Sequence, residues 1–222
     1  MMIDLSDFRK NYEKNSLLES EVPKEPFLLF NNWFEQEKSF YNDNKKKDNK
    51  EEINAMSIST IGEDGGPETR VVLLKEYSED GFIFYTNYYS LKGRSIQNIP
   101  KVCISFYWKN MERQIIIKGI TSKIKRKKSD EYFHKRPIGN QIGSWVSRQS
   151  MILSSKESLL KEYNKWNNFF NQKTIKRPFY WGGYIVKPYK MEFWQGQPNR
   201  LHDRLVYILE KEKKWILYRL YP

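Results

Sequence analysis

Several residue types and motifs that mark common kinds of active site are scarce or missing. The chain has one cysteine and two histidines, so it can form no internal disulfide and offers no Cys/His cluster for zinc. The GxSxG sequence of a nucleophile elbow is missing, as are the glycine patterns of Walker and Rossmann phosphate loops. We therefore expect no metal site, no serine hydrolase of that type and no nucleotide site built on those loops.

Long apolar runs are also lacking, and the opening residues are not expected to form a leader sequence. No run approaches the roughly 18 apolar residues of a membrane span. The opening MMIDLSDFRKNYEKN is too acidic and polar for a signal or transit peptide. We expect a cytoplasmic protein with no membrane partner. Cys103 lies in the apolar run VCISF, which is typical of a buried strand, and it is assigned no redox role.

Aromatic and basic residues, by contrast, are abundant. Aromatics make up 16% of the chain, which favours a β-rich protein. We expect a single domain over residues 1–222, since one domain of this size can bury about 70% of its unfolded surface. The net charge of +12 attracts nucleic acid, anionic lipid or small phosphorylated ligands alike. Lysine-rich runs, which are usually solvated faces, carry much of the excess: Lys45–Lys47, Lys125–Lys128 and Lys211–Lys214.

Helical patterns occur in the first fifty residues and between the later strands. Phe8–Glu13 is a short candidate, and residues 26–41 form a longer one with apolar side chains at helical spacing. Residues 1–50 are therefore expected to be a helical N-terminal segment. Three further helices are expected, at residues 90–98, 127–136 and 155–170.

Period-two alternation and short apolar runs dominate from Ala55 onward. The candidate strands are residues 55–61, 68–77, 81–87, 101–108, 113–121, 181–196, 204–210 and 215–221. Glycine-containing turns such as GEDGG and SEDG separate neighbouring strands and favour antiparallel pairing. The pattern predicts a mainly β protein with peripheral helices (α+β), built on one closed or nearly closed barrel.

Basic side chains near strand ends are candidates for phosphate binding. Arg70 and Lys75 lie five residues apart, so in a continuous strand they point to opposite faces and serve different targets, unless both are ordinary solvent-facing cations. Ser90 is a candidate helix N-cap with Lys92 in the first turn, where free N–H groups, the helix dipole and an ammonium converge. Many helices begin this way with nothing bound.

Two further groups combine cations with aromatic rings. Tyr132 and Arg136 lie four residues apart on one face of a predicted helix, where they either grip a phosphate together or pack on each other at the surface. Near the C-terminus, two cations, a histidine and an indole lie close together: Trp194, Arg200, His202 and Arg204. Arg200 and His202 share a face if this segment is extended, and the group favours an anionic or aromatic ligand.

The order of these segments closely resembles the pyridoxamine 5′-phosphate oxidase family, from about Phe8 to the last residue. The matching stretches are RVVLLK at 70–75, FYTN at 84–87, ERQ at 112–114, YFHKRP at 132–137, QIGSWVSRQS at 141–150, YWGG at 180–183, EFWQG at 192–196, RLHDR at 200–204 and the terminal RLYP. The resemblance implies an FMN-binding split β-barrel that works as a homodimer with two flavins at the subunit interface. It also implies oxidation of pyridoxamine and pyridoxine 5′-phosphates to pyridoxal 5′-phosphate.

The same resemblance implies roles for individual residues. Those expected to bind FMN are Arg70, Lys75, Tyr85, Thr86, Lys92, Gln114, Gln149, Ser150, Trp194 and Arg204. Those expected to bind substrate are Lys75, Tyr132, Arg136, Asn140, Arg200 and His202, together with Arg9 and Tyr12. The catalytic pair, Arg200 and His202, would hold the pyridine ring over the flavin while a hydride passes from C4′ to N5 and dioxygen reoxidises the flavin, giving hydrogen peroxide.

Two positions depart from the family pattern, and two other functions stay open. Leu91 stands where the family usually has an arginine, and Asn140 where it usually has a serine. A split-barrel flavoprotein with another substrate is one alternative, although Tyr132, Arg136, Arg200 and His202 would then have no clear task. The other is a basic barrel whose aromatic rings stack nucleic-acid bases. We predict the oxidase, with no nucleic-acid partner.

Overall fold

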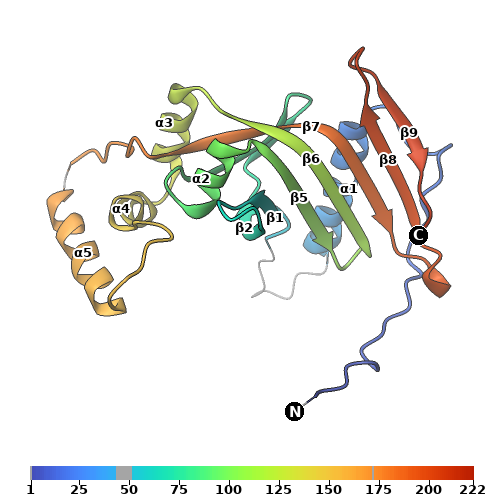
Figure 1. Cartoon of the computed structure of the whole chain (residues 1–222), viewed down its shortest axis with the longest axis horizontal. Helices are drawn as coiled ribbons and strands as arrows, with labels where there is room; N and C mark the ends of the chain where they lie inside the picture. The colour runs from blue at the N-terminus through green and yellow to red at the C-terminus, as the bar shows by residue number, and fades with distance from the viewer. Residues whose placement is uncertain (1, 44–51, 172) are drawn as a thin grey trace. The chain divides into compact units, whose positions relative to one another are not determined.

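The computed structural model describes residues 2–43, 52–171 and 173–222, which form two compact units. The first unit comprises Met1–Ala55, Ile104–Lys118 and Pro188–Pro222, and the second comprises Met56–Cys103 and Gly119–Lys187. Each unit is assembled from segments that are distant in the sequence. The long strands β5, β6 and β7 contribute residues to both units (Figure 1).

Nine strands carry the fold in the described part of the chain, and seven of the eight predicted strands are confirmed. They are β1 Ala55–Ile61, β2 Pro67–Leu73, β3 Glu76–Ser78, β4 Gly81–Asn87, β5 Lys101–Trp108, β6 Arg113–Lys123, β7 Trp181–Gln195, β8 Asp203–Leu209 and β9 Trp215–Arg219. Hydrogen bonds join them in the order β2-β1-β5-β6-β7-β4-β3, with β8 on β7 and β9 on β8. The pairs β3·β4, β4·β7, β7·β8 and β8·β9 are antiparallel. One expected strand, residues 68–77, is interrupted between β2 and β3.

The helices follow prediction less closely. They are α1 Pro26–Asp43, α2 Leu91–Asn98, α3 Arg126–Lys135, α4 Ile138–Val146, α5 Lys156–Phe169 and the short 3-10 helix η1 Pro198–Arg200. The expected helix at Phe8–Glu13 is wrong, since these residues have no helical structure. A single turn gains little by itself in water. The backbone N–H groups of Glu13, at its end, and of the following Lys14 bind the Glu112 carboxylate instead.

Helix α4 was not expected from the sequence, because Gly139 and Gly143 lower its helix propensity. Tertiary packing overrides that preference. Ile142 is 2% exposed within a cluster that contains Phe133 and Trp181, and α4 packs beside α5 (Figure 1). Burial of one such side chain stabilises the fold by about 1.5–3 kcal/mol. This exceeds the cost of one glycine in a helix, which is roughly 1 kcal/mol.

Each unit has its own apolar core. In the first unit α1 begins with Pro26 at its first position and buries Phe30 and Trp33, and the Trp33 ring meets Phe193 edge to face. In the second unit Phe82 and Phe84 of β4 are fully buried. Cys103 lies in β5 as expected, but its side chain is half-buried rather than buried.

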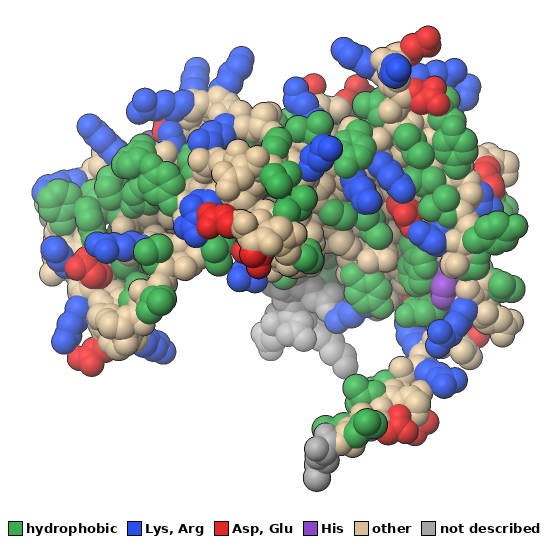
Figure 2. Space-filling model, in the orientation of Figure 1, with side chains coloured by type: hydrophobic (Ala, Val, Ile, Leu, Met, Phe, Trp, Pro, Cys, Tyr) green, Lys and Arg blue, Asp and Glu red, His purple; other side chains and the backbone are tan. Residues whose placement is uncertain are grey.

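The surface carries charges of both signs. Figure 2 shows Lys and Arg side chains spread over the visible face with Asp and Glu between them. The run Lys45–Lys47 lies outside the described residues. No helix in the part of the chain that the structure describes is long and apolar enough to cross a membrane.

Candidate active site

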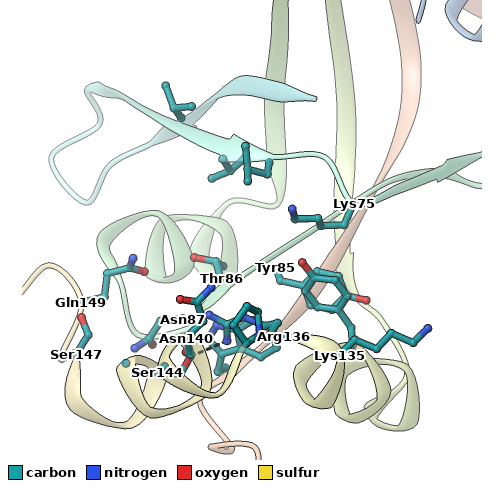
Figure 3. A pocket seen from close by; sticks show the side chains of 18 of the residues that line it. Lys75, Tyr85, Thr86, Asn87, Lys135, Arg136, Asn140, Ser144, Ser147 and Gln149 are labelled. Carbon is teal, nitrogen blue, oxygen red and sulfur yellow. Dashed lines mark hydrogen bonds between the residues drawn. The ribbon is translucent and has the colours of Figure 1, made fainter. Parts of the chain in front are cut away.

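A cavity of about 640 Å³ lies in the second unit, between the strands β2 and β4, the helices α2, α3 and α4, and the start of β7. Eight of the predicted site residues line it: Lys75, Tyr85, Thr86, Lys92, Tyr132, Arg136, Asn140 and Gln149. Figure 3 shows Gln149 and Ser147 at one end of this cavity and Lys75 and Tyr85 at the other, while Lys135 extends away from them. The lining therefore offers polar groups at two separated positions.

Helix α2 brings a buried ammonium group to the cavity. Ser90 caps the helix as predicted: its Oγ accepts a hydrogen bond from the Gly93 N–H at 3.2 Å and donates one to the Asn87 carbonyl at 2.7 Å. Lys92, in the first turn, is 9% exposed, and its Nζ lies 3.5 Å from Thr86 Oγ1. Burial, and then the positive charge of Arg70, lower the pKa of Lys92 below its ordinary value.

The negative charge of Glu68 acts against this lowering of the Lys92 pKa without outweighing it. No carboxylate of the described residues forms an ion pair with Lys92, whereas most buried ammonium groups are paired. A buried ammonium without an ion pair in the first turn of a helix suits an anion, since the helix dipole also favours negative charge there. A glycine is required at position 93 in the first turn of α2, because a Cβ there would lie 2.4 Å from the Tyr88 carbonyl oxygen.

The break between β2 and β3 changes the expected relation of Arg70 and Lys75. The chain leaves the strand ladder at Leu74, whose side chain is buried, so the face argument for a continuous strand is wrong. The Lys75 N–H donates to the Ile83 carbonyl at 2.9 Å, and its side chain lines the cavity. Arg70 is exposed and outside the lining, and its Nη1 donates to the Thr69 carbonyl. Even so, the positive charge of Arg70 contributes to lowering the pKa of Lys92.

Tyr132 and Arg136 both reach the cavity, and each packs on a different aromatic ring. The Tyr132 ring stacks on Tyr85 with centroids 3.9 Å apart. Arg136 is the C-cap of α3; its guanidinium lies 4.5 Å from the Trp181 ring and donates to Ser144 Oγ at 2.7 Å. Burial raises the pKa of Tyr132 and lowers that of Arg136. The phenol stays protonated at neutral pH and the guanidinium stays charged, so both are hydrogen-bond donors.

Helix α4 and the loop after it supply lining residues that sequence reasoning missed. Asn140, Gly143, Ser144 and Ser147 all line the cavity, and only Asn140 was predicted. These residues are three and four positions apart, which is helical spacing. This periodicity was the sequence signal that could have predicted a helix here. Ser150 lies outside the lining with φ 72°, and its Oγ accepts from the Leu91 N–H at 3.2 Å, at the start of α2.

The first unit brings three other predicted residues together. The Tyr12 ring lies 5.5 Å from Trp194 and 5.7 Å from His202, and the Trp194 and His202 centroids are 4.8 Å apart. The Gln197 N–H donates to His202 Nδ1 at 3.0 Å. Because Nδ1 accepts this bond, the neutral imidazole carries its proton on Nε2. Tyr12, Trp194 and His202 form what we call the ring cluster, and its histidine offers an N–H donor.

Arg200 is held differently from the prediction. The segment is not extended, because η1 spans Pro198–Arg200, and Asn199 and Arg200 have φ of 55° and 61°. The argument that Arg200 and His202 share a strand face is therefore wrong. Among the residues the structure describes, Arg200 has no ion pair or hydrogen bond from its side chain, and Asp203 is instead bound by Arg219 at 2.7 Å.

The remaining predicted residues contact other groups. Arg204 donates twice to Glu192 Oε1, at 2.9 and 2.7 Å, and Gln114 donates to Ser105 Oγ at 3.3 Å. Arg9 is exposed and donates to the Ser6 carbonyl. The structure thus places ten of the predicted residues in the second unit and seven in the first.

Comparisons with known proteins give the family. A protein-family model described as pyridoxamine 5′-phosphate oxidase matches residues 43–170, more than half of the chain. A second, described as the pyridoxine 5′-phosphate oxidase C-terminal dimerisation region, matches residues 181–222. The chain belongs to the pyridoxamine 5′-phosphate oxidase family. The predicted family and the expectation of an enzyme of this class are confirmed.

Relatives and solved structures agree with that assignment. A pyridoxine/pyridoxamine 5′-phosphate oxidase from Flavobacterium johnsoniae is 49% identical over 219 residues, 99% of each chain, and one from Bacteroides thetaiotaomicron is 42% identical over 221 residues, 100% of each. The structure of PhzG from Burkholderia lata, in complex with tetrahydrophenazine-1-carboxylic acid, is 26% identical, with a TM-score of 0.83 over 94% of this chain and 98% of PhzG.

A pyridoxamine 5′-phosphate oxidase-related, FMN binding protein from Nostoc punctiforme shares the fold, with a TM-score of 0.69 at 14% identity over 90% of this chain and 100% of its own. The predicted mainly β split-barrel fold is therefore confirmed. Within this family pattern, Leu91 opens α2 and brings no charge to the helix start, where Lys92 is the buried cation. Asn140 lines the cavity from the first turn of α4.

Proposed function

We propose that the chain catalyses the FMN-dependent oxidation of pyridoxine and pyridoxamine 5′-phosphates to pyridoxal 5′-phosphate, as a cytoplasmic homodimer. The observation that carries this proposal is the cavity of the second unit. It combines an unpaired buried ammonium at one helix start with a separate group of lysine, tyrosine and arginine. An enzyme that binds a phosphorylated cofactor and a phosphorylated substrate side by side needs two such anion sites.

The start of α2 fits the phosphate of FMN. Lys92 supplies a desolvated positive charge, and Arg70 adds a second one near it. Ser150 lies at the first N–H group of the helix and Gln149 lines the cavity beside it. Tyr85 and Thr86 on β4 continue the lining. These donors suit a dianionic phosphate followed by a polar ring system.

The other group fits the phosphate of the substrate. Lys75 contributes a point charge and Arg136 a planar guanidinium that Ser144 and the Trp181 ring hold in place. The protonated Tyr132 phenol donates a hydrogen bond, and its stacking on Tyr85 fixes the ring. Asn140 can donate through its amide. Four donors of different geometry would select a phosphate over a carboxylate.

A homodimer gives the first unit its role. The residues predicted to cover the substrate ring and the flavin, Trp194, Arg200 and His202 among them, lie within the stretch that matches the dimerisation model. We propose that FMN binds at the subunit interface, where this stretch of one subunit completes the cavity of the other. Arg200, whose side chain has no partner among the described residues, is then available to the substrate.

The residues of the chain would mainly bind and orient the substrate and FMN. FMN, when bound, would supply N5 as the hydride acceptor for C4′ of the substrate and would be reoxidised by dioxygen with release of hydrogen peroxide. Arg200 would hold the pyridine ring, and His202 would present its Nε2–H, since Nδ1 already accepts from Gln197. Holding C4′ within about 3–3.5 Å of its acceptor accounts for a large part of such a rate effect.

A direct assay tests the proposal. The purified protein should be yellow with bound FMN, and it should convert pyridoxine 5′-phosphate to pyridoxal 5′-phosphate with one hydrogen peroxide per turnover. Pyridoxine without its phosphate should react far more slowly, because the charges of Lys75 and Arg136 are then unused. Flavin binding with oxidation of neither phosphate ester would instead favour a flavoprotein with another substrate. A colourless protein that retains nucleic acid would favour the basic binding barrel.

A further inference from the structure

A buried carboxylate in the first unit has no task in the reaction proposed above. Glu112 lies in the turn between β5 and β6, its side chain is 2% exposed, and its backbone adopts φ 58°. A charge is rarely buried unless other groups compensate it, and a left-handed backbone is unfavourable for a residue other than glycine. The surroundings of Glu112 must therefore hold it there.

The carboxylate binds one short segment near the N-terminus. Its Oε2 accepts from the backbone N–H groups of Glu13 and Lys14, at 2.9 and 3.2 Å, and its Oε1 pairs with Lys10 Nζ at 2.8 Å. The Lys14 ammonium donates to the Asn110 carbonyl in the same turn. Burial by itself raises the pKa of Glu112, but these bonds outweigh it and lower the pKa below the ordinary value. Glu112 is thus the common acceptor for residues 10–14.

The backbone of Glu112 is fixed to the end of β7. Its carbonyl accepts from the Gly196 N–H at 2.9 Å and from Gln195 Nε2 at 3.3 Å. Gln195 Oε1 in turn accepts from Arg113 Nε at 2.8 Å. One residue therefore connects the N-terminal segment to the strand end that carries Trp194.

The segment held in this way carries Tyr12. In Figure 1 it passes beside the turn that precedes β8. The Tyr12 ring meets Trp194 and His202 edge-on, and it lies so close to Gly196 that a Cβ there would come within 2.6 Å of Tyr12 Cγ. The backbone N–H groups of Glu13 and Lys14, which follow Tyr12 directly, donate to Glu112 and so hold the Tyr12 ring in this position.

We propose that Glu112 is a positioning residue: its carboxylate holds residues 10–14 so that the Tyr12 ring covers Trp194 and His202. This inference rests on the proposed function where it says that the covered rings face the substrate. Glu112 itself does not contact the reacting atoms, because its carboxylate oxygens are engaged by the segment and by Lys10. Its effect on turnover passes through Tyr12.

The experiment compares Glu112→Gln with Glu35→Gln in the full-length holoenzyme. Glutamine keeps the size but removes the charge and one acceptor oxygen, whereas Glu35 only pairs with Lys38 on the surface of α1. Trypsin cleavage after Lys10 and Lys14, followed by mass spectrometry, should accelerate about tenfold in Glu112→Gln, as expected for loss of a charge-assisted hydrogen bond, and should not change in the control. Unchanged cleavage would overturn the proposal, whether or not the chain is an oxidase.

Kinetics distinguish positioning from a general structural role. Glu112→Gln should raise the KM for pyridoxine 5′-phosphate more than it lowers kcat, with FMN affinity and Tm close to the parent. In a Tyr12→Ala background the same change should have no further effect on KM, because the covering ring is already gone. Additive effects on KM would contradict the proposal. If Glu112→Gln fails to fold, Lys10→Met, at an exposed position, should show the same pattern with smaller changes, with cleavage compared after Lys14 because the site at residue 10 is lost. Parent-like cleavage after Lys14 and a parent-like KM there would contradict the proposal.

Discussion

The cavity of the second unit and the ring cluster of the first unit are built by different means. Regular elements line the cavity: Lys92 comes from a capped helix and Tyr85 from the middle of a strand. The ring cluster is held by irregular backbone, with left-handed residues at Glu112 and Arg200 and hydrogen bonds to a segment about a hundred residues away in sequence. The cationic groups of the cavity are thus set by regular elements, while the ring cluster depends on loops that side chains hold in place.

The largest effect is expected in the cavity. Arg136→Ala should lower kcat/KM for pyridoxine 5′-phosphate by about 100-fold, since a charge-assisted hydrogen bond contributes about 1.5–3 kcal/mol and the buried partners lose their donor. Arg126→Ala is the matched control, because Arg126 lies on the same helix, is 89% exposed and pairs with Asp130 only at 3.7 Å. A parent-like kcat/KM in Arg136→Ala would remove Arg136 from the substrate site.

A smaller loss is expected in the ring cluster and its neighbours. Arg200→Ala should leave FMN bound at full stoichiometry and should lower kcat as well as raise KM, together by about tenfold or more, because one contact serves both binding and near-attack geometry. Steady-state kinetics with a flavin titration measure both quantities. If the variant oxidises pyridoxine 5′-phosphate with the parent kcat and KM, the RLHDR segment does not bind substrate.

Adding a charge at the start of α2 should strengthen the cavity. Leu91→Arg should tighten FMN binding by about tenfold if the new guanidinium forms one full charge-assisted hydrogen bond to the phosphate. Titration of the apoprotein with FMN measures this, with Leu91→Met as the uncharged control. An unchanged affinity would mean that Lys92 and Arg70 already neutralise the phosphate.

The smallest effect concerns pH. Because burial lowers the pKa of Lys92, its ammonium loses its proton at a lower pH than an ordinary lysine does. The affinity of the apoprotein for FMN should therefore begin to fall with rising pH below the ordinary lysine pKa of about 10.4. In Lys92→Arg the guanidinium stays charged, so the fall should vanish. An identical pH dependence in both proteins would show that another group controls it.

Much of this arrangement could be predicted from the sequence, and the failures have physical causes. The strand pattern and the Ser90 cap depend on local periodicity and capping chemistry, which adjacent residues determine. Helix α4 was missed because packing of Ile142 overrides its glycines. The short helix at Phe8–Glu13 was wrongly expected because the Glu13 N–H at its end binds Glu112, a contact that local sequence cannot reveal. The face argument for Arg70 and Lys75 failed at the break after β2.

The most direct test of the account asks whether the two regions complete one site across a homodimer. Arg136→Ala alters the cavity and Arg200→Ala the covering segment, and two differently tagged chains carrying one change each can be co-expressed. If each site draws on both subunits, every mixed dimer holds one site with both arginines intact. Random pairing should then restore about a quarter of the parent activity, because half of the dimers are mixed and half of their sites are intact. If the co-expressed protein is no more active than the two separate variants, the sites are not shared between subunits and the account is contradicted.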